Sequence, residues 1–104
     1  MMVTSSSAIA GKRIVKTMGL VKGNTVRARH IGKDIVAVFK NIVGGEIEEY
    51  TKLLAESRDQ SLDRMIADAE RLGANAVVDV RFSTSYIMAN AAEILVYGTA
   101  VVVE

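Results

Sequence analysis

Residues 46–72 read EIEEYTKLLAESRDQSLDRMIADAERL, and this stretch predicts one long α-helix. Side chains of one face recur every three or four residues, which is the period of a helical face. The members of this face are Ile47, Tyr50, Leu54, Ser57, Ser61, Met65, Ala69 and Leu72. Acidic residues at the start and Arg71 at the end complement the helix dipole, and Gly73 suits the left-handed conformation that ends a helix. The rest of the chain must then supply the strands against which this face packs.

Strand patterns flank the helix on both sides. Residues 13–29 mix apolar and basic residues, with a clean alternation at residues 26–29 and a bulge, bend or turn expected at residues 22–24. Residues 74–86 alternate, so Val78, Val80 and Phe82 are expected on one face. Residues 92–103 are apolar on both faces, and such a strand must be covered twice. Residues 88–91 are the expected hairpin connection.

The interpretation of residues 34–43 stays open between a strand and a helix. The β-branched residues of this segment favour a strand, whereas its apolar residues also fit a helical stripe. We expect a short helix here, followed by a corner at residues 44–45. The predicted order is strand, short helix, long helix and a two-strand hairpin. This is an α+β fold with a helix layer on an antiparallel sheet.

The composition bounds the class of protein. A chain of 104 residues predicts one domain, residues 1–104, and the interior must be mostly aliphatic because 50% of the residues are hydrophobic but only 5% are aromatic. The absence of cysteine excludes disulfides, thiolate metal sites and cysteine nucleophiles. No secretion signal or membrane span is expected. We therefore expect a cytoplasmic protein with no membrane partner.

The net charge of +1 hides an uneven distribution. Residues 1–40 hold eight basic residues and one acid, whereas residues 46–72 hold eight acids and four basic residues. Such asymmetry can mark a nucleic-acid-binding face. However, the basic residues are spread over strands and no aromatic residues are interleaved for base stacking. We expect the two regions to complement each other, within or between subunits, and we do not expect nucleic acid as a partner.

The length of the predicted helix favours assembly into a homo-oligomer. About 27 helical residues span roughly 40 Å, whereas a compact domain of about 100 residues has a radius of gyration near 13 Å. Because the apolar stripe continues to both ends, part of it would overhang the sheet. Another copy of the chain would cover this surface, and closed assemblies of identical subunits are common. The alternative is a monomer with a bent helix.

Sequence motifs lie along nearly the whole chain. They are residues 34–46 (DIVAVFKNIVGGE), Tyr50-Thr51, Arg58, Arg64-Met65, residues 72–77 (LGANAV), Arg81-Phe82, Glu93 and residues 97–101 (YGTAV). In this combination the chain resembles the YbjQ-like family, small uncharacterised prokaryotic proteins often labelled "putative heavy-metal-binding". The resemblance implies a dodecin-like α+β subunit assembled as a ring, a homopentamer. It implies little about activity.

Arg58, Arg64 and Glu93 are the candidate functional residues. The resemblance places both arginines at motif positions in the helix, and Glu93 interrupts an otherwise apolar strand. We expect these residues to form inter-subunit ion pairs or buried hydrogen-bond networks. With His30 as the one histidine, no nucleophile–base set is recognisable. We therefore expect no catalytic residue and no enzymatic activity.

Ligand binding at subunit junctions is the alternative function. Carboxylates suit hard ions such as Mg²⁺ or Ca²⁺, whereas a cysteine-free chain lacks ligands for a thiophilic ion. The candidate carboxylates are Glu46, Glu49, Asp59 and Asp63, and none is assigned as a metal ligand. A small anion could instead bind a basic strand face or the amides at residues 44–45. A dodecin-like fold also raises flavin binding, but the chain has no Trp to stack on a flavin, and we expect no cofactor.

Overall fold

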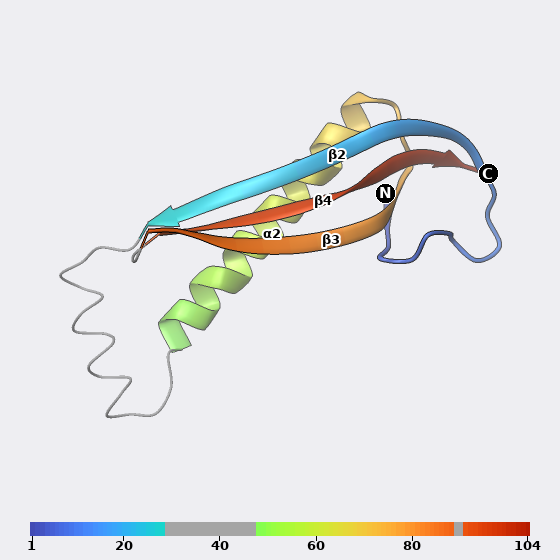
Figure 1. Ribbon diagram of the computed structural model, residues 1–104. Helices are drawn as coiled ribbons and strands as arrows, with labels where there is room; N and C mark the ends of the chain where they lie inside the picture. The colour runs from blue at the N-terminus through green and yellow to red at the C-terminus, as the bar shows by residue number, and fades with distance from the viewer. Residues whose placement is uncertain (29–47, 89–90) are drawn as a thin grey trace.

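A computed structural model describes residues 1–28, 48–88 and 91–104. Its elements are β1 (Met2–Val3), β2 (Ile14–Ala28), α2 (Glu48–Arg71), β3 (Ala76–Met88) and β4 (Ala91–Val103). The strands form one sheet in the order β1-β3-β4-β2, in which β2 and β3 are antiparallel to β4 and β1 is parallel to β3. The helix lies on one face of this sheet (Figure 1). The α+β prediction is confirmed, and the parallel β1 makes the sheet mixed.

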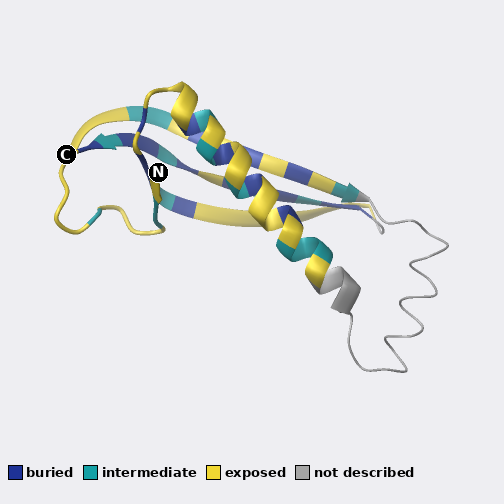
Figure 2. Cartoon of the chain, turned by 180° about the vertical axis from the view of Figure 1, so that it is seen from behind, coloured by how far each residue is buried: buried dark blue, intermediate teal, exposed yellow. Residues whose placement is uncertain are grey.

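Helix α2 buries the middle of the predicted face against the sheet, whereas Leu72, which was expected on this face, follows the helix and is 43% exposed. Ser57, Ser61, Met65 and Ala69 are buried at steps of four. Figure 2 shows that buried segments recur along the helix where it crosses the strands. At the end of the helix Gly73 adopts a φ of 83°. The Gly73 amide then donates to Glu70 O (3.0 Å) and the Ala74 amide to Ala69 O (3.1 Å). This pair of bonds closes the helix as expected from the sequence. The expected short helix at 34–43 lies outside the described residues.

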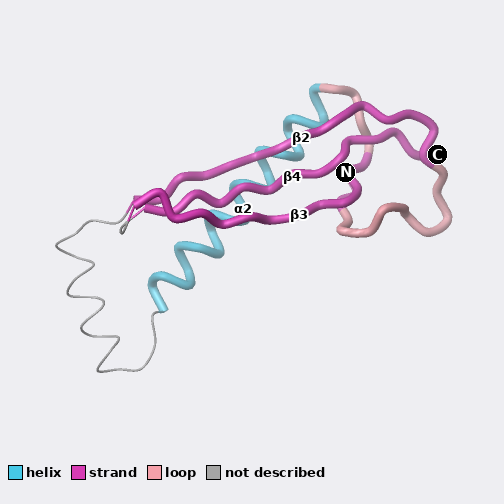
Figure 3. Tube along the Cα trace, viewed as in Figure 1, coloured by secondary structure: helices cyan, strands magenta, loops and turns pink. Residues whose placement is uncertain are grey.

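Strand β2 runs without a turn, which contradicts the bend or turn expected at residues 22–24. The irregularity in its pairing with β4 lies instead between Ile14 and Gly19. Gly23 has a different role, because a Cβ at this position would lie 2.1 Å from Ser61 O and 2.5 Å from Met65 N. The helix therefore rests directly on the backbone of β2 at Gly23. Figure 3 shows the three long strands β2, β3 and β4 side by side, with the helix crossing them at an angle.

Strand β3 contains a break in its alternation at Asp79. This residue has a φ of 54°, and the register with β4 shifts between Val78 and Arg81. As a result Val80 packs in the core beneath the helix, whereas Val78 packs in a second cluster on the opposite face. The prediction that Val78 and Val80 share a face is wrong, because the extra residue at Asp79 inverts the order of the faces.

Strand β4 lies in the middle of the sheet and is covered on both faces, as its two-sided apolar pattern predicts. On the helix side Val96 and Ala100 belong to the main core. On the other side Val101 and Val103 form a smaller cluster against which Ile9 packs. The second cover therefore comes from the chain's own N-terminal segment, and it protects only one end of that face.

The molecule is elongated. Its Cα radius of gyration is 17.3 Å, compared with about 13 Å for a compact domain of 100 residues. Ser57 contacts Thr25 and Arg27 near the last residue of β2, and helical residues 48–56 precede this contact. In Figure 1 the first turns of α2 diverge sideways from the strands, which extend as far as the helix does, so the predicted overhang past the end of the sheet is not seen. In the described part of the chain no helix has the length and apolar character of a membrane span.

Candidate functional site

Arg64 and Asp68 reach from α2 to the outer edge of β2. The Arg64 guanidinium donates from Nη1 to Asn24 O (2.5 Å), and the Lys22 amide donates to Asp68 Oδ2 (3.3 Å). The other oxygen of Asp68 forms an ion pair with Arg71. An edge strand normally presents free N–H and C=O groups that invite another strand. Here an i, i+4 pair of side chains occupies two of those groups, so we refer to Arg64 and Asp68 as the β2 edge cap.

Glu93 and Arg64 meet the same residue from different directions. Asn24 donates from Nδ2 to Glu93 Oε2 (3.2 Å), while its carbonyl accepts from Arg64. Glu93 is half-buried on β4. Arg58 is exposed on the helix and makes no hydrogen bond to another described residue. The structure thus links two of the three candidate residues through Asn24 and leaves Arg58 apart.

A cluster of buried hydroxyl groups, which was not predicted from the sequence, lies between the helix and the sheet. Thr25 Oγ1 donates to Ser57 O (3.2 Å) and lies 3.0 Å from Ser61 Oγ. Ser61 Oγ donates to Ile94 O (3.1 Å). All three hydroxyl residues are at most 3% exposed. Two serines four residues apart inside a buried helical stripe were the available signal.

Arg27 extends this cluster to the surface. Its Nε donates to Ser57 Oγ (2.8 Å), which in turn donates to Leu53 O (2.9 Å), and its Nη2 donates to Gln60 Oε1. Each buried hydroxyl is therefore engaged, which is what burial of polar groups requires. Residues 26 and 27 alternate between the two faces of the sheet, as expected. The basic Arg27 lies on the helix side, and the apolar Val26 lies on the other side, where it is 54% exposed. The cluster fastens the helix to the strand and presents no free nucleophile among these hydroxyls.

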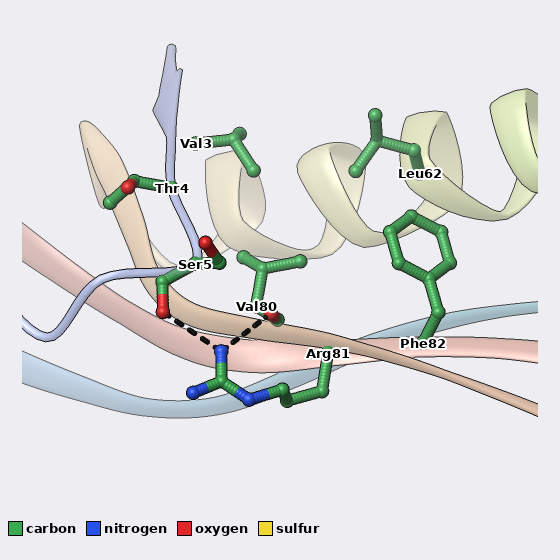
Figure 4. A pocket seen from close by; sticks show the side chains of 7 residues that line it. All are labelled: Val3, Thr4, Ser5, Leu62, Val80, Arg81 and Phe82. Atoms are coloured by element: carbon green, nitrogen blue, oxygen red, sulfur yellow. Dashed lines mark hydrogen bonds between the residues drawn. The ribbon is translucent and has the colours of Figure 1, made fainter.

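The N-terminal segment, α2 and β3 border an open groove on the helix side (Figure 4). It is lined by Val3, Thr4, Ser5, Leu62, Val80, Arg81 and Phe82. The Phe82 ring points from β3 toward the helix near Leu62, yet Phe82 is 50% exposed. The Arg81 guanidinium lies on the other side of the strand and donates to Ser5 O (2.8 Å) and Val80 O (2.9 Å). The lining of the groove is thus mostly apolar, and its one cation is turned away.

Large apolar side chains continue along β3 beyond this groove. Tyr86 is 72% exposed and Met88 is 60% exposed. The helix runs mainly over β2 and β4, so it leaves this part of β3 uncovered. The segment from Phe82 to Met88, which we call the β3 open segment, contains no charged residue. An uncharged strand with exposed aromatic side chains is typical of an interaction surface.

The structure brings no metal site together in its described part. Among residues 1–28, 48–88 and 91–104, no three His, Cys, Asp or Glu side chains are grouped closely enough to hold a metal ion. Asp59 and Asp63 are exposed on α2. Glu46, His30 and the Gly44-Gly45 corner lie outside the described residues, as does the side chain of Glu49.

Together the fold and these sites define a class of small α+β proteins with one helix on a four-stranded mixed sheet. A family model described as "Putative heavy-metal-binding" matches residues 1–104, and the chain belongs to this YbjQ family. A UPF0145 protein of Dehalococcoides mccartyi (strain BAV1) is 61% identical over 104 residues, covering all of both chains. A UPF0145 protein of Methanosarcina acetivorans is 54% identical over 101 residues, covering 97% of this chain and 95% of the relative.

A solved structure has the same fold. It is a protein of unknown function from Pediococcus pentosaceus that belongs to the DUF74 family, and it matches with a TM-score of 0.71. The match covers 100% of this chain and 98% of the other at 13% sequence identity. At this identity the likeness describes the fold alone.

Proposed function

We propose that the chain is the subunit of a homo-oligomeric structural or ligand-binding protein, assembled as a pentameric ring. The observation that carries this proposal is the apolar surface left exposed on β3, where Tyr86 and Met88 are 72% and 60% exposed. Full burial of such a side chain contributes about 1.5–3 kcal/mol. For a protein with a total stability of about 5–15 kcal/mol, covering several of them matters.

Other features support assembly. Leu20, Val26 and Tyr97 are exposed on β2 and β4, so apolar surface is also present on the sheet face turned away from the helix. The elongated shape of the molecule, with a radius of gyration of 17.3 Å, suits a part of a larger particle. A cytoplasmic location, expected from the cysteine-free composition, belongs to the same proposal. The pentameric number comes from the family resemblance.

Light scattering coupled to gel filtration at micromolar concentration tests this proposal. The expected mass is five times the 11.2 kDa of the chain, or ten times where two rings associate. A particle of another multiple would keep the homo-oligomer and remove the pentamer. A mass of one chain at all concentrations would overturn the assembly itself.

A second candidate function is binding of a metal ion or small anion at subunit junctions. The family description and the exposed carboxylates Asp59 and Asp63, one turn apart on α2, favour it. Oxygen ligands from neighbouring copies would suit Mg²⁺ or Ca²⁺. Calorimetric titration of the assembled protein with divalent metals and nucleotides is the test, with Asp63→Asn as the control variant. Heats that stay flat for every ion and nucleotide would end this candidate.

We propose a binding or structural role in preference to catalysis. The buried hydroxyl groups of Thr25, Ser57 and Ser61 are all engaged in hydrogen bonds between helix and sheet. A nucleophile would need a base within hydrogen-bond reach and a free position beside it. These hydroxyls hold the fold together instead.

A further inference from the structure

The two edges of the sheet differ in what occupies their outward backbone groups. The N-terminal segment covers the outer edge of β3 as far as Val80, through bonds from the Thr4 amide to Val77 O (3.0 Å) and from the Val80 amide to Thr4 O (3.1 Å). Beyond Val80, the described residues place no strand beside the β3 open segment. On the opposite edge, the β2 edge cap occupies the backbone at Lys22 and Asn24.

The register identifies the backbone groups that point out of the β3 edge. The Lys22 amide points away from β4, so Gly23 and its partner Val96 face each other through their backbone bonds. On β4 the next residue, Leu95, must then direct its backbone toward β3, where it pairs with Ser83. By the same alternation the N–H and C=O groups of Phe82, Thr84 and Tyr86 point outward. Three consecutive outward positions can accept another strand.

We propose that the β3 open segment pairs with the same segment of a second copy, antiparallel and about a two-fold axis near Thr84. This inference rests on the proposed homo-oligomeric function and names one of its contacts. In this register Phe82 of one copy lies opposite Tyr86 of the other, and aromatic cross-strand pairs are favourable. Because the segment carries no charge, self-pairing sets no like charges against each other.

The rest of the structure is compatible with this contact. Both helices would lie on the same face of one continuous sheet, since the axis is perpendicular to that sheet. The helix packs mainly over β2 and β4, so the helix-side face of β3 stays accessible to the second copy. A sheet that grew from β3 of one copy to β2 of the next would meet the edge cap at Lys22 and Asn24 instead. Strand addition at an exposed edge is an established mode of recognition.

A two-fold contact has a consequence for the number of chains. It is isologous, so it cannot by itself close a ring of five copies. In an assembly built from pentameric rings it joins copies of two rings, and the particle then contains an even number of chains. Without rings it produces a dimer.

Thr84→Pro tests the contact directly, with Thr84→Ala as the matched control. The Thr84 amide points outward, so proline removes no bond to β4 but blocks an added strand. We expect Thr84→Pro to halve the particle mass in light scattering, while Thr84→Ala keeps it and both retain the wild-type circular dichroism. An unchanged mass for a folded Thr84→Pro would overturn the inference. It would leave the proposed homo-oligomer intact, because a homo-oligomer is overturned only if the wild-type protein is monomeric.

A cross-linking experiment does not depend on the fold of the proline variant. The chain has no cysteine, so Thr84→Cys introduces a single thiol. Directly opposed residues of antiparallel strands are close enough for a disulfide. Mild oxidation of Thr84→Cys should give a covalent dimer, whereas Lys52→Cys, on the exposed side of α2, should not. Equal cross-linking of the two variants would contradict the pairing.

Discussion

Gly23 of β2 lies directly against Ser61 of α2, with no room between them for a side chain. A Cβ on Gly23 would sit 2.1 Å from the Ser61 carbonyl oxygen and 2.9 Å from the Arg64 Cβ. This contact sets the distance between helix and sheet. It also brings the hydroxyl cluster and the β2 edge cap within reach of β2, because their helical residues lie within about two turns of Ser61.

Gly23→Ala should therefore destabilise the protein although it adds only one methyl group. The obstructing atoms belong to the backbone of α2, so the helix must move, and overpacking of this kind costs about 3 kcal/mol. Urea unfolding at a fixed protein concentration measures the effect. Lys16→Ala, at an exposed site on the same strand, should change stability by less than about 0.5 kcal/mol. A Gly23→Ala midpoint equal to that of wild type would show that the helix is not seated on this residue.

The buried hydroxyl cluster should act as a unit. Thr25→Val and Ser61→Ala each remove one member of the 3.0 Å pair and leave other polar atoms unpaired, at a cost of about 1–2 kcal/mol each. The double variant should lose less than the sum of the two, by about 1 kcal/mol. Thermal unfolding of the three variants provides this cycle. Strict additivity would mean that the two hydroxyls do not interact.

The bulge in β3 should depend on the residue type at Asp79. Its φ of 54° lies in the left-handed region, which asparagine tolerates and β-branched residues do not. Asp79→Val should cost about 2–3 kcal/mol, since it also loses the bond from Ser7 Oγ to Asp79 Oδ1 (3.0 Å). Asp79→Asn keeps an acceptor there and should unfold close to wild type. Equal melting temperatures for the two variants would argue against the strained conformation.

The β2 edge cap should protect against uncontrolled strand addition. Removing both members with Arg64→Ala and Asp68→Ala exposes the backbone of Lys22 and Asn24, so aggregation at high protein concentration should increase. The control is Arg58→Ala with Asp59→Ala, which removes the same two charges from exposed positions on the same helix. Turbidity and static light scattering compare the pairs. The same aggregation rate in both would attribute the effect to charge alone.

The helix and the central strand were predictable because each satisfies one simple periodicity. The face containing Ser57, Ser61, Met65 and Ala69 is buried, and β4 is covered on both sides, as their patterns indicate. The family was also predictable, because its motifs extend over the whole chain. The ring and its number of copies stay predictions.

Other features depend on contacts that a linear pattern does not contain. Gly23 suggested a turn, but the glycine is required by the approach of a helix distant in sequence. Asp79 gave no sign of the bulge that separates Val78 from Val80. Arg64 and Glu93 were identified as candidates, whereas their shared neighbour Asn24 was not. Such relations appear only once helix and sheet are placed together.

Another copy of the chain is expected to cover the apolar surface of β3. Hydrogen–deuterium exchange of the assembled protein measures this at the outward amides of Phe82, Thr84 and Tyr86. We expect these three amides to exchange slowly in the assembled wild-type protein. In Thr84→Lys the amides of Phe82 and Tyr86 should exchange faster than in the wild-type protein. Exchange of the wild-type amides as fast as that of the exposed loop at Ala10 and Gly11 would contradict it.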